Sequence, residues 1–289
     1  KTVYGKVIIG VTGFLSIVAL SICFGVSRQT KHLVNQPLGY NMDGIVCLEF
    51  EGEEASIIYD KLTTLTFIEK AGIYSLLPTG KIMTSVRDDA GKDERVYMLE
   101  GTEEFFNILG IRILEDYNVA SVDKEDGKYY VCESSLSALA PYMQDGNIRK
   151  YHPTPLCGII SDFKLGTLKE ESTGRITLAN ITTEDVILEW GGYLMAKVNI
   201  DEEEAKKRIE EFCIKNGYKD YMFNAYVMRD LVENNIKEEK NMIKLLTGFS
   251  FICILMTVLT IVGLSSYHTT TTEKDNAIRN VFGCSRKER

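Results

Sequence analysis

The chain has 289 residues, of which 45% are hydrophobic and 26% are charged, and its formal net charge at pH 7 is −8. This acidic balance makes nucleic acid a poor candidate partner. The apolar residues gather in two uncharged stretches, Val7–Val26 and Leu245–Tyr267. Each stretch is about long enough to cross a ~30 Å hydrocarbon core at ~1.5 Å per helical residue. The sequence therefore predicts a membrane protein in which two transmembrane helices flank a large polar domain.

Two simpler interpretations of the apolar stretches fit less well. A secretory signal would explain the first, but the run is longer than a usual signal core and no A-x-A-like site follows it. A buried core helix would explain the second, but such a helix rarely runs so far without a charge. We expect five segments: an N-terminal transmembrane helix (1–27), an extracytoplasmic α+β domain (28–224), a helical stalk (225–244), a second transmembrane helix (245–267) and a cytoplasmic segment (268–289).

The charges predict the orientation of the chain in the membrane. Residues 1–6 and residues 268–289 each carry a net charge of +2, so the total of −8 leaves −12 for the part in between. Basic flanks are retained in the cytoplasm, whereas long acidic domains cross the membrane with little penalty. Both chain ends are therefore expected in the cytoplasm and the polar domain outside it.

Candidate strands and helices alternate along the polar domain. Apolar and β-branched runs bounded by turn residues predict strands, and periodic apolar positions predict helices. Their mixture favours an α+β fold over a β-sandwich. The expected strands are Ile45–Phe50, Ala71–Leu76, Arg95–Leu99, Tyr129–Cys132, Gly158–Phe163, Val186–Trp190 and Tyr193–Val198, and the expected helices are Glu54–Phe67, Phe105–Leu109 and Ser134–Ala140.

The best-marked helix of this domain is Glu202–Asn216. Asp201 precedes it as an N-cap, Glu204 completes a capping-box pattern, and Gly217 follows as a stop signal. The acidic run at 202–204 has the composition of a cation site, but the helix dipole favours acidic residues at a helix start in any case. We interpret the run as structural.

A second helical pattern, residues 225–244, continues into the second apolar stretch without Pro or Gly. An unbroken helix of this kind would be a stiff lever between domain and membrane, and a simple spacer would show the same spacing.

Sequence signatures of catalysis are missing from the chain. Gly80-Lys81 lacks the remainder of a Walker A motif, the three histidines form no H-E-x-x-H, and no G-x-S-x-G occurs. No C-x-x-C is present either, and the cysteines of the polar domain do not have the number or spacing of a disulfide framework. We expect no enzyme activity, cofactor or metal site in the chain itself.

The tail after the second apolar stretch contains a distinctive segment at residues 275–285, with the sequence D-N-A-I-R-N-V-F-G-C-S. This segment resembles the E-I-x-I-R-K-V-x-G-A-S pattern of the MacB/FtsX-like family of ABC transporter permeases. Asp275 replaces Glu conservatively, and Asn276 and Asn280 depart from the pattern. The matching positions are Ile278, Arg279, Val281, Gly283 and Ser285.

Three segments of the polar domain resemble the same family in the same order. Residues 38–45 (L-G-Y-N-M-D-G-I) are similar to L-G-F-x-x-D-x-V, residues 105–111 (F-F-N-I-L-G-I) to F-F-x-x-L-G-I, and residues 158–163 (G-I-I-S-D-F) to G-V-V-x-D-F. Glu238-Glu239-Lys240, before the second apolar stretch, is similar too. The resemblance thus extends over nearly the whole chain.

This resemblance implies a permease subunit or half-subunit in the bacterial inner (cytoplasmic) membrane, with its core domain outside. The expected partners are a cytoplasmic ABC ATPase subunit, a second permease copy or half, and the lipid bilayer. Asp275, Ile278, Arg279, Val281, Phe282, Gly283 and Ser285 would contact the ATPase. The residues agree with this role, because Ile278, Val281 and Phe282 form one apolar helix face beside Arg279.

The resemblance further implies mechanotransmission, in which ATP-driven movement of the ATPase is passed through the second span to the outer domain. It also implies two more spans after residue 289, so the chain is expected to be part of a longer permease.

Other interpretations remain open at this point. The tail has the composition of an amphipathic helix lying on anionic lipid. The whole chain also has the layout of a two-span receptor with an extracytoplasmic ligand-sensing domain, and a membrane-anchored enzyme is a third alternative without a visible site. A receptor should continue as a long signalling helix, whereas a permease should re-enter the membrane.

Overall fold

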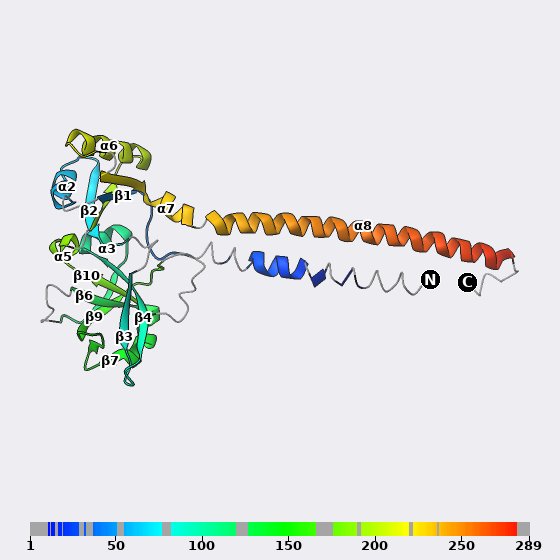
Figure 1. Cartoon of the computed structure of the whole chain (residues 1–289), viewed down its shortest axis with the longest axis horizontal. Helices are drawn as coiled ribbons and strands as arrows, with labels where there is room; N and C mark the ends of the chain where they lie inside the picture. Colours follow the sequence, from blue (N-terminus) through cyan, green and yellow to red (C-terminus); the bar gives the residue numbers. More distant parts are fainter. Residues whose placement is uncertain are drawn as a thin grey trace. The chain divides into compact units, whose positions relative to one another are not determined.

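A computed structural model describes residues 11, 13–14, 17–18, 20–28, 32, 37–50, 55–76, 82–119, 127–165, 176–189, 192–219, 222–235 and 237–281. The chain divides into two compact units. One is Pro37–Ile236, a mixed domain of strands and helices, and the other joins Lys1–Gln36 with Lys237–Arg289 and holds the apolar helices (Figure 1).

The mixed domain is built on a 12-stranded sheet with the order β12-β1-β11-β2-β4-β10-β6-β9-β8-β7, to which β3 is added beside β4 and β5 beside β9. Most neighbours are antiparallel, but β10 runs parallel to β4 and β6 runs parallel to β9. The strands are β1 (Ile45–Phe50), β2 (Ile68–Tyr74), β3 (Ile82–Arg87), β4 (Asp93–Gly101), β5 (Ile113–Asp116), β6 (Lys128–Cys132), β7 (Met143–Gln144), β8 (Asn147–Ile148), β9 (Thr154–Ile160), β10 (Thr177–Ile181), β11 (Tyr193–Val198) and β12 (Phe223–Val227).

The sheet has a narrow link in its middle. The single residue pair Tyr74 and Gly101 joins β2 to β4. This link separates a first lobe, formed by β12, β1, β11 and β2, from a second lobe formed by β3 to β10. Helix α3 (Glu103–Leu109) lies beside the link, where the Phe105 ring stacks on the Tyr74 ring with 5.2 Å between centroids.

Helices cover both faces of the first lobe. Alternate residues of a strand point to opposite faces, and in β1 Ile45 and Cys47 belong to a different core from Val46 and Leu48. The core of Val46 and Leu48 is completed by α2 (Ala55–Leu62), α5 (Glu184–Glu189) and α6 (Glu202–Lys215). The core of Ile45 and Cys47, which we call the central core, is completed by α3, by α7 (Met228–Asn235) and by residues of the second lobe. A third core lies within the second lobe and includes Leu139 of the short helix α4 (Leu136–Leu139).

The sequence predicted the mixed α+β class of this domain, and β1, β6, β11, α3 and α6 lie at or within a few residues of their predicted positions. The strand predicted at Val186–Trp190 is wrong, because α5 occupies Glu184–Glu189 and Ile187 packs its buried side chain into the first lobe from a helix. Trp190 itself lies outside the described residues.

The predicted helix at 225–244 is also wrong in its first turn. Ala225, Tyr226 and Val227 belong to β12, where they pair with Leu48, Cys47 and Val46 of β1. Helical structure begins at Met228 with α7 and continues from Lys237 as α8 (Lys237–Val281), and Ile236 between them lies outside the described residues. Residues 223–227 form a strand because they pair with the edge of β1, although the spacing of their apolar residues also suits a helix.

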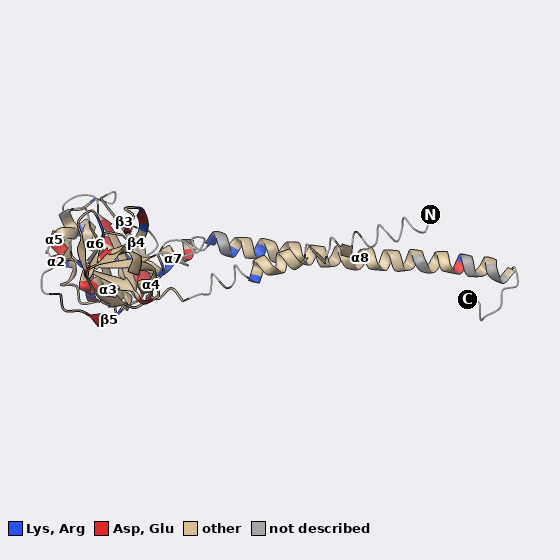
Figure 2. Ribbon diagram, turned by 90° about the horizontal axis from the view of Figure 1, so that it is seen from below, with Lys and Arg blue, Asp and Glu red and all other residues tan. Residues whose placement is uncertain are grey.

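The second unit is dominated by α8, a helix of 45 residues. No charged residue occurs from 245 to 272. Figure 2 shows the described part of this stretch of α8 in tan, with blue Lys residues near the start of the helix. Within the described residues, Lys240–Lys274 is the one helix whose length and apolarity suit a membrane span. The predicted first span at Val7–Val26 falls partly outside the described residues; residues 20–28 are helical.

Candidate functional site

The predicted ATPase-contacting segment lies partly at the end of α8. Asp275, Ile278, Arg279 and Val281 belong to the helix, while Phe282, Gly283 and Ser285 lie outside the described residues. The side chains of Ile278 and Val281 are 57% and 84% exposed. They are three residues apart, so they share one face of the helix. Both residues lie beyond Glu273 and Lys274, the charged residues that end the apolar stretch of α8.

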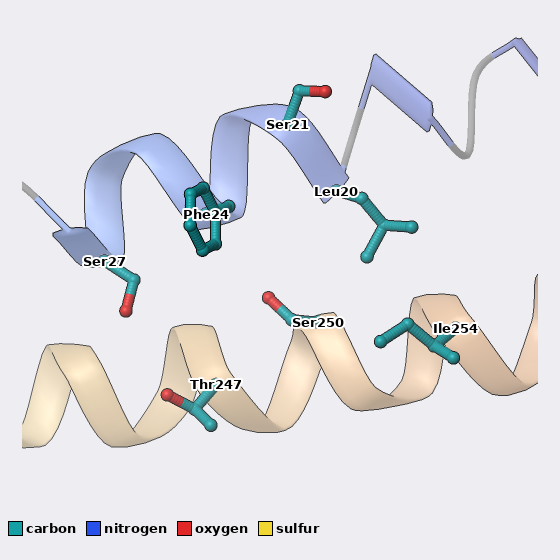
Figure 3. Close-up of a pocket in the computed structure, with 7 residues that line it drawn as sticks. All are labelled: Leu20, Ser21, Phe24, Ser27, Thr247, Ser250 and Ile254. Carbon is teal, nitrogen blue, oxygen red and sulfur yellow. The ribbon is translucent and has the colours of Figure 1, made fainter.

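A groove lies between residues 20–27 and α8 within the second unit. Its volume is about 480 Å³, and in Figure 3 Leu20 and Phe24 point toward α8. The other lining residues are Ser21, Ser27, Thr247, Ser250 and Ile254. The hydroxyl groups of Ser21, Thr247 and Ser250 each donate to a carbonyl oxygen one turn earlier in their own helix, at 2.8 Å. These donors are therefore used within the helices, and none of the described residues that line the groove is charged.

The cysteines of the mixed domain are free, buried thiols. Burial raises the pKa of Cys47, Cys132 and Cys213 to about 12 and raises the pKa of Cys157 as well. A thiol needs to ionise before it can act as a nucleophile or bind a metal. These four residues therefore serve as small core side chains.

No group of three or more His, Cys, Asp or Glu side chains in the described part of the chain is arranged to hold a metal ion. Asn180 of the Asn180-Ile181-Thr182 triplet is 3% exposed, and its amide donates to a Glu100 carboxylate oxygen at 2.8 Å. It is therefore part of the sheet interior and not a surface acceptor for a glycan.

The structure brings together the three domain segments that carry the family resemblance, residues 38–45, 105–111 and 158–163. The Lys164 N–H donates to the Leu38 carbonyl at 2.9 Å, and the Asn41 N–H donates to the Leu109 carbonyl at 2.7 Å. Aromatic and aliphatic side chains of the three segments meet in the central core: Leu38, Tyr40, Met42, Phe105, Phe106, Leu109, Ile111, Ile160 and Phe163. These motifs are therefore packing elements of one core.

Two glycines of these motifs have a steric explanation. Gly39 has φ +81°, and a Cβ there would lie 2.1 Å from the Asp162 carbonyl oxygen. Gly110 has φ +72° and caps α3, where its N–H donates to the Asn107 carbonyl at 3.1 Å. Because the left-handed region suits glycine, both positions favour it on backbone grounds.

Sequence reasoning missed a charged cluster at the start of β1. Arg229 of α7 lies 2.8 Å from an Asp43 carboxylate oxygen and 3.6 Å from a Glu202 carboxylate oxygen. Glu202 also accepts the Gly44 N–H at 2.5 Å, and the Lys197 ammonium donates to the Asp43 carbonyl oxygen at 2.5 Å. We call Asp43, Gly44, Lys197, Glu202 and Arg229 the Arg229 cluster. The acidic side chain of Glu202 was already explained by its position at the start of a helix. Residues 43 and 229 are far apart in the sequence, and no sequence pattern connects them.

No family model matches the chain, and no curated protein matches it. Among solved structures, the periplasmic region of MacB from Actinobacillus actinomycetemcomitans is similar at 13% identity and a TM-score of 0.46, covering 71% of this chain and 98% of that one. The extracellular domain of the noncanonic ABC-type transporter YknZ from Gram-positive bacteria is similar at 9% identity and a TM-score of 0.42, covering 63% of this chain and 99% of that one.

Proposed function

We propose that the chain is a permease subunit or half-subunit of an ABC transporter and that it couples ATP hydrolysis by a separate ATPase to movement of its mixed domain. The apolar face of Ile278 and Val281, at the end of the same helix that carries the membrane span, supports this proposal best. Residues 275–285, which include Arg279, resemble the segment that contacts the ATPase in the MacB/FtsX-like family.

The orientation follows from the charges. The basic tail beyond residue 268 belongs in the cytoplasm, and the acidic mixed domain belongs outside. A bacterial cytoplasmic membrane provides these two sides, and a second permease copy or half would match the two subunits of an ATPase dimer.

The mechanism rests on the stiffness of α8. A continuous α-helix of 45 residues extends roughly 67 Å at ~1.5 Å per residue, which is longer than the ~30 Å hydrocarbon core. A displacement of Ile278 and Val281 by a partner is therefore carried along the helix axis to Lys237. Transport through a pore is not needed for this coupling.

The test is a pull-down of the full chain from membranes in mild detergent. Wild type is compared with an Arg279→Ala/Phe282→Ala double variant and with Arg286→Ala, which removes a tail charge outside the motif. We expect an ABC ATPase to co-purify with wild type and with Arg286→Ala but not with the double variant.

Two other results have clear meanings. Equal ATPase recovery from all three samples would show that the motif is not the contact. No ATPase in any sample of folded protein would refute the permease proposal and favour the two-span receptor.

A further inference from the structure

The Arg229 cluster joins the turn before the first strand of the mixed domain to the last helix of that domain. Asp43 and Gly44 form the turn through which the chain enters β1, and Arg229 is the second residue of α7, the last helix of the domain. In addition, the Val198 N–H donates to the Gly44 carbonyl at 2.9 Å, which fixes the turn to the end of β11. The turn before β1 and the last helix of the domain are therefore held together at one end of the first lobe.

The cluster also connects helices on opposite faces of the sheet. α7 packs on the central core through Met228 and Val232, which are 0% and 5% exposed, and the Met228 sulfur lies 4.0 Å from the Cys47 sulfur. α6 packs on the other face through Ala205, Ile209 and Cys213. Arg229 from α7 and Glu202 from α6 meet at the start of β1, so their ion pair connects helices that pack on opposite faces of the sheet.

The ion pairs of the Arg229 cluster are partly exposed to solvent, so they can break and form again without unfolding of the domain. The side chains of Arg229 and Asp43 are 48% and 74% exposed, and exposed ion pairs contribute little to global stability. Glu202 is more protected, at 20% exposure, and accepts a backbone N–H as well as facing Arg229. Gly44 has φ +64°, which places its N–H in a turn that a side chain would strain.

We infer that the Arg229 cluster is a clasp through which a displacement of α7 is passed to the turn before β1 and to α6, so that the helices on both faces of the first lobe move together. In this arrangement Arg229 is a positioning residue, and Glu202 links the α7 charge to the backbone of the turn. The inference deepens the proposed function and rests on it for the source of the displacement.

The coupling itself is measured on the full chain in detergent, without an ATPase or nucleotide, by hydrogen exchange and mass spectrometry. Arg229→Gln should accelerate exchange about fivefold both in residues 41–46 and in residues 201–206, because the turn and the first turn of α6 open together when the clasp is released. High salt should reproduce part of this effect in wild type, since it screens exposed charges.

Arg208→Gln is the matched control. Arg208 forms an ion pair with Glu204 at 2.5 Å within α6, and its side chain is 51% exposed. Its loss should accelerate exchange in α6 and leave residues 41–46 unchanged. The exchanged pair Asp43→Arg/Arg229→Asp keeps the Asp–Arg contact with the charges reversed but places a carboxylate against Glu202. It should therefore restore protection in residues 41–46 and leave residues 201–206 unprotected.

Exchange in residues 41–46 and 201–206 that stays within twofold of wild type in Arg229→Gln overturns the clasp. Acceleration in residues 41–46 alone overturns the link to α6. Both results are independent of the pull-down, so a missing ATPase would refute the proposed function while leaving the clasp intact, and a failed clasp would leave the ATPase contact intact.

Discussion

Gly39→Ala tests whether the motif segments set the geometry of the central core. Gly39 has φ +81° and faces the Asp162 carbonyl oxygen and the Phe163 Cα, at 2.1 Å and 2.8 Å from the position of an added Cβ. A left-handed conformation costs a non-glycine residue about 1–2 kcal/mol, and forcing a methyl group against fixed backbone typically adds about 1–3 kcal/mol. The free energy of unfolding should therefore fall by about 2–5 kcal/mol.

Gly91→Ala is the matched control for this prediction. Gly91 has φ +80°, but no heavy atom lies within 4 Å of an added Cβ. Only the conformational cost of about 1–2 kcal/mol should appear. Urea unfolding of the full chain in detergent, followed by the fluorescence of Trp190, the single tryptophan, measures both variants. Equal destabilisation by the two substitutions would show that the contact between residue 39 and residues 162–163 contributes nothing.

Three further predictions concern the core, the thiols and α8. Thr102→Ala should lower the free energy of unfolding by about 1–2 kcal/mol, because the buried Thr102 hydroxyl accepts hydrogen bonds from the N–H groups of Phe105 and Ile73. Thr102→Ser keeps the hydroxyl and should therefore retain most of this stability. Burial raises the pKa of Cys132 from 9.0 to about 12. The buried neutral thiol therefore contributes its full share to the free energy of unfolding below pH 9, and this share is lost as the pH rises toward 12, because the thiol of the unfolded chain ionises first. Wild type should therefore lose about 1.4 kcal/mol more than Cys132→Ala between pH 8 and pH 10, and parallel urea-unfolding profiles would contradict the assignment. A Gly-Gly-Ser-Gly insertion after Asn241 should abolish ATP-dependent changes in hydrogen exchange of the mixed domain while the co-purified ATPase remains active, and unchanged coupling would refute the role of α8 as a stiff connection.

The sequence was informative where one local signal dominated. Asp201 accepts the N–H groups of Glu203 and Glu204 at 3.1 Å, as an N-cap should, and Gly217 follows α6 with φ +91°. The capping-box partner behaved differently, because the Glu204 carboxylate pairs with Arg208 instead of returning to the start of the helix. A local pattern thus located the helix, and competition between neighbouring charges decided the side-chain contact.

Sheet order and edge strands were beyond sequence reasoning. The apolar spacing of the β12 residues is also compatible with the start of a helix. These residues form a strand in the structure, where they pair with β1 at the edge of the sheet. β10 lies between β4 and β6 although more than forty residues separate it from either strand along the chain. Such pairings depend on contacts between distant segments, which a local period of two or 3.6 residues does not encode.

The Arg229 cluster was missed for a related reason. Asp43, Glu202 and Arg229 have no special pattern in their own segments, and the fold alone brings the Arg229 guanidinium within 4 Å of both carboxylates. The motif segments were found by resemblance, but their role was not, because the sequence could not show that all three contribute to one core.

The central core explains why motif residues of different segments belong together. The two lobes are joined within the sheet by the residue pair Tyr74 and Gly101 and by two flanking backbone hydrogen bonds, from the Thr102 N–H to the Ile73 carbonyl and from the Ser75 N–H to the Glu100 carbonyl, which is a short connection. The central core adds side chains from both lobes, with Phe105 of α3 against Tyr74 of the first lobe and Phe163 and Ile160 from the second. A Cβ at Gly101 would lie 2.2 Å from the Phe105 ring, so the close approach of α3 to the link depends on glycine there. Because α7 also inserts Met228 into this core, a displacement of α7 acts on the region that holds the lobes together. The motif segments of the mixed domain therefore contribute side chains to the core in which its two lobes meet.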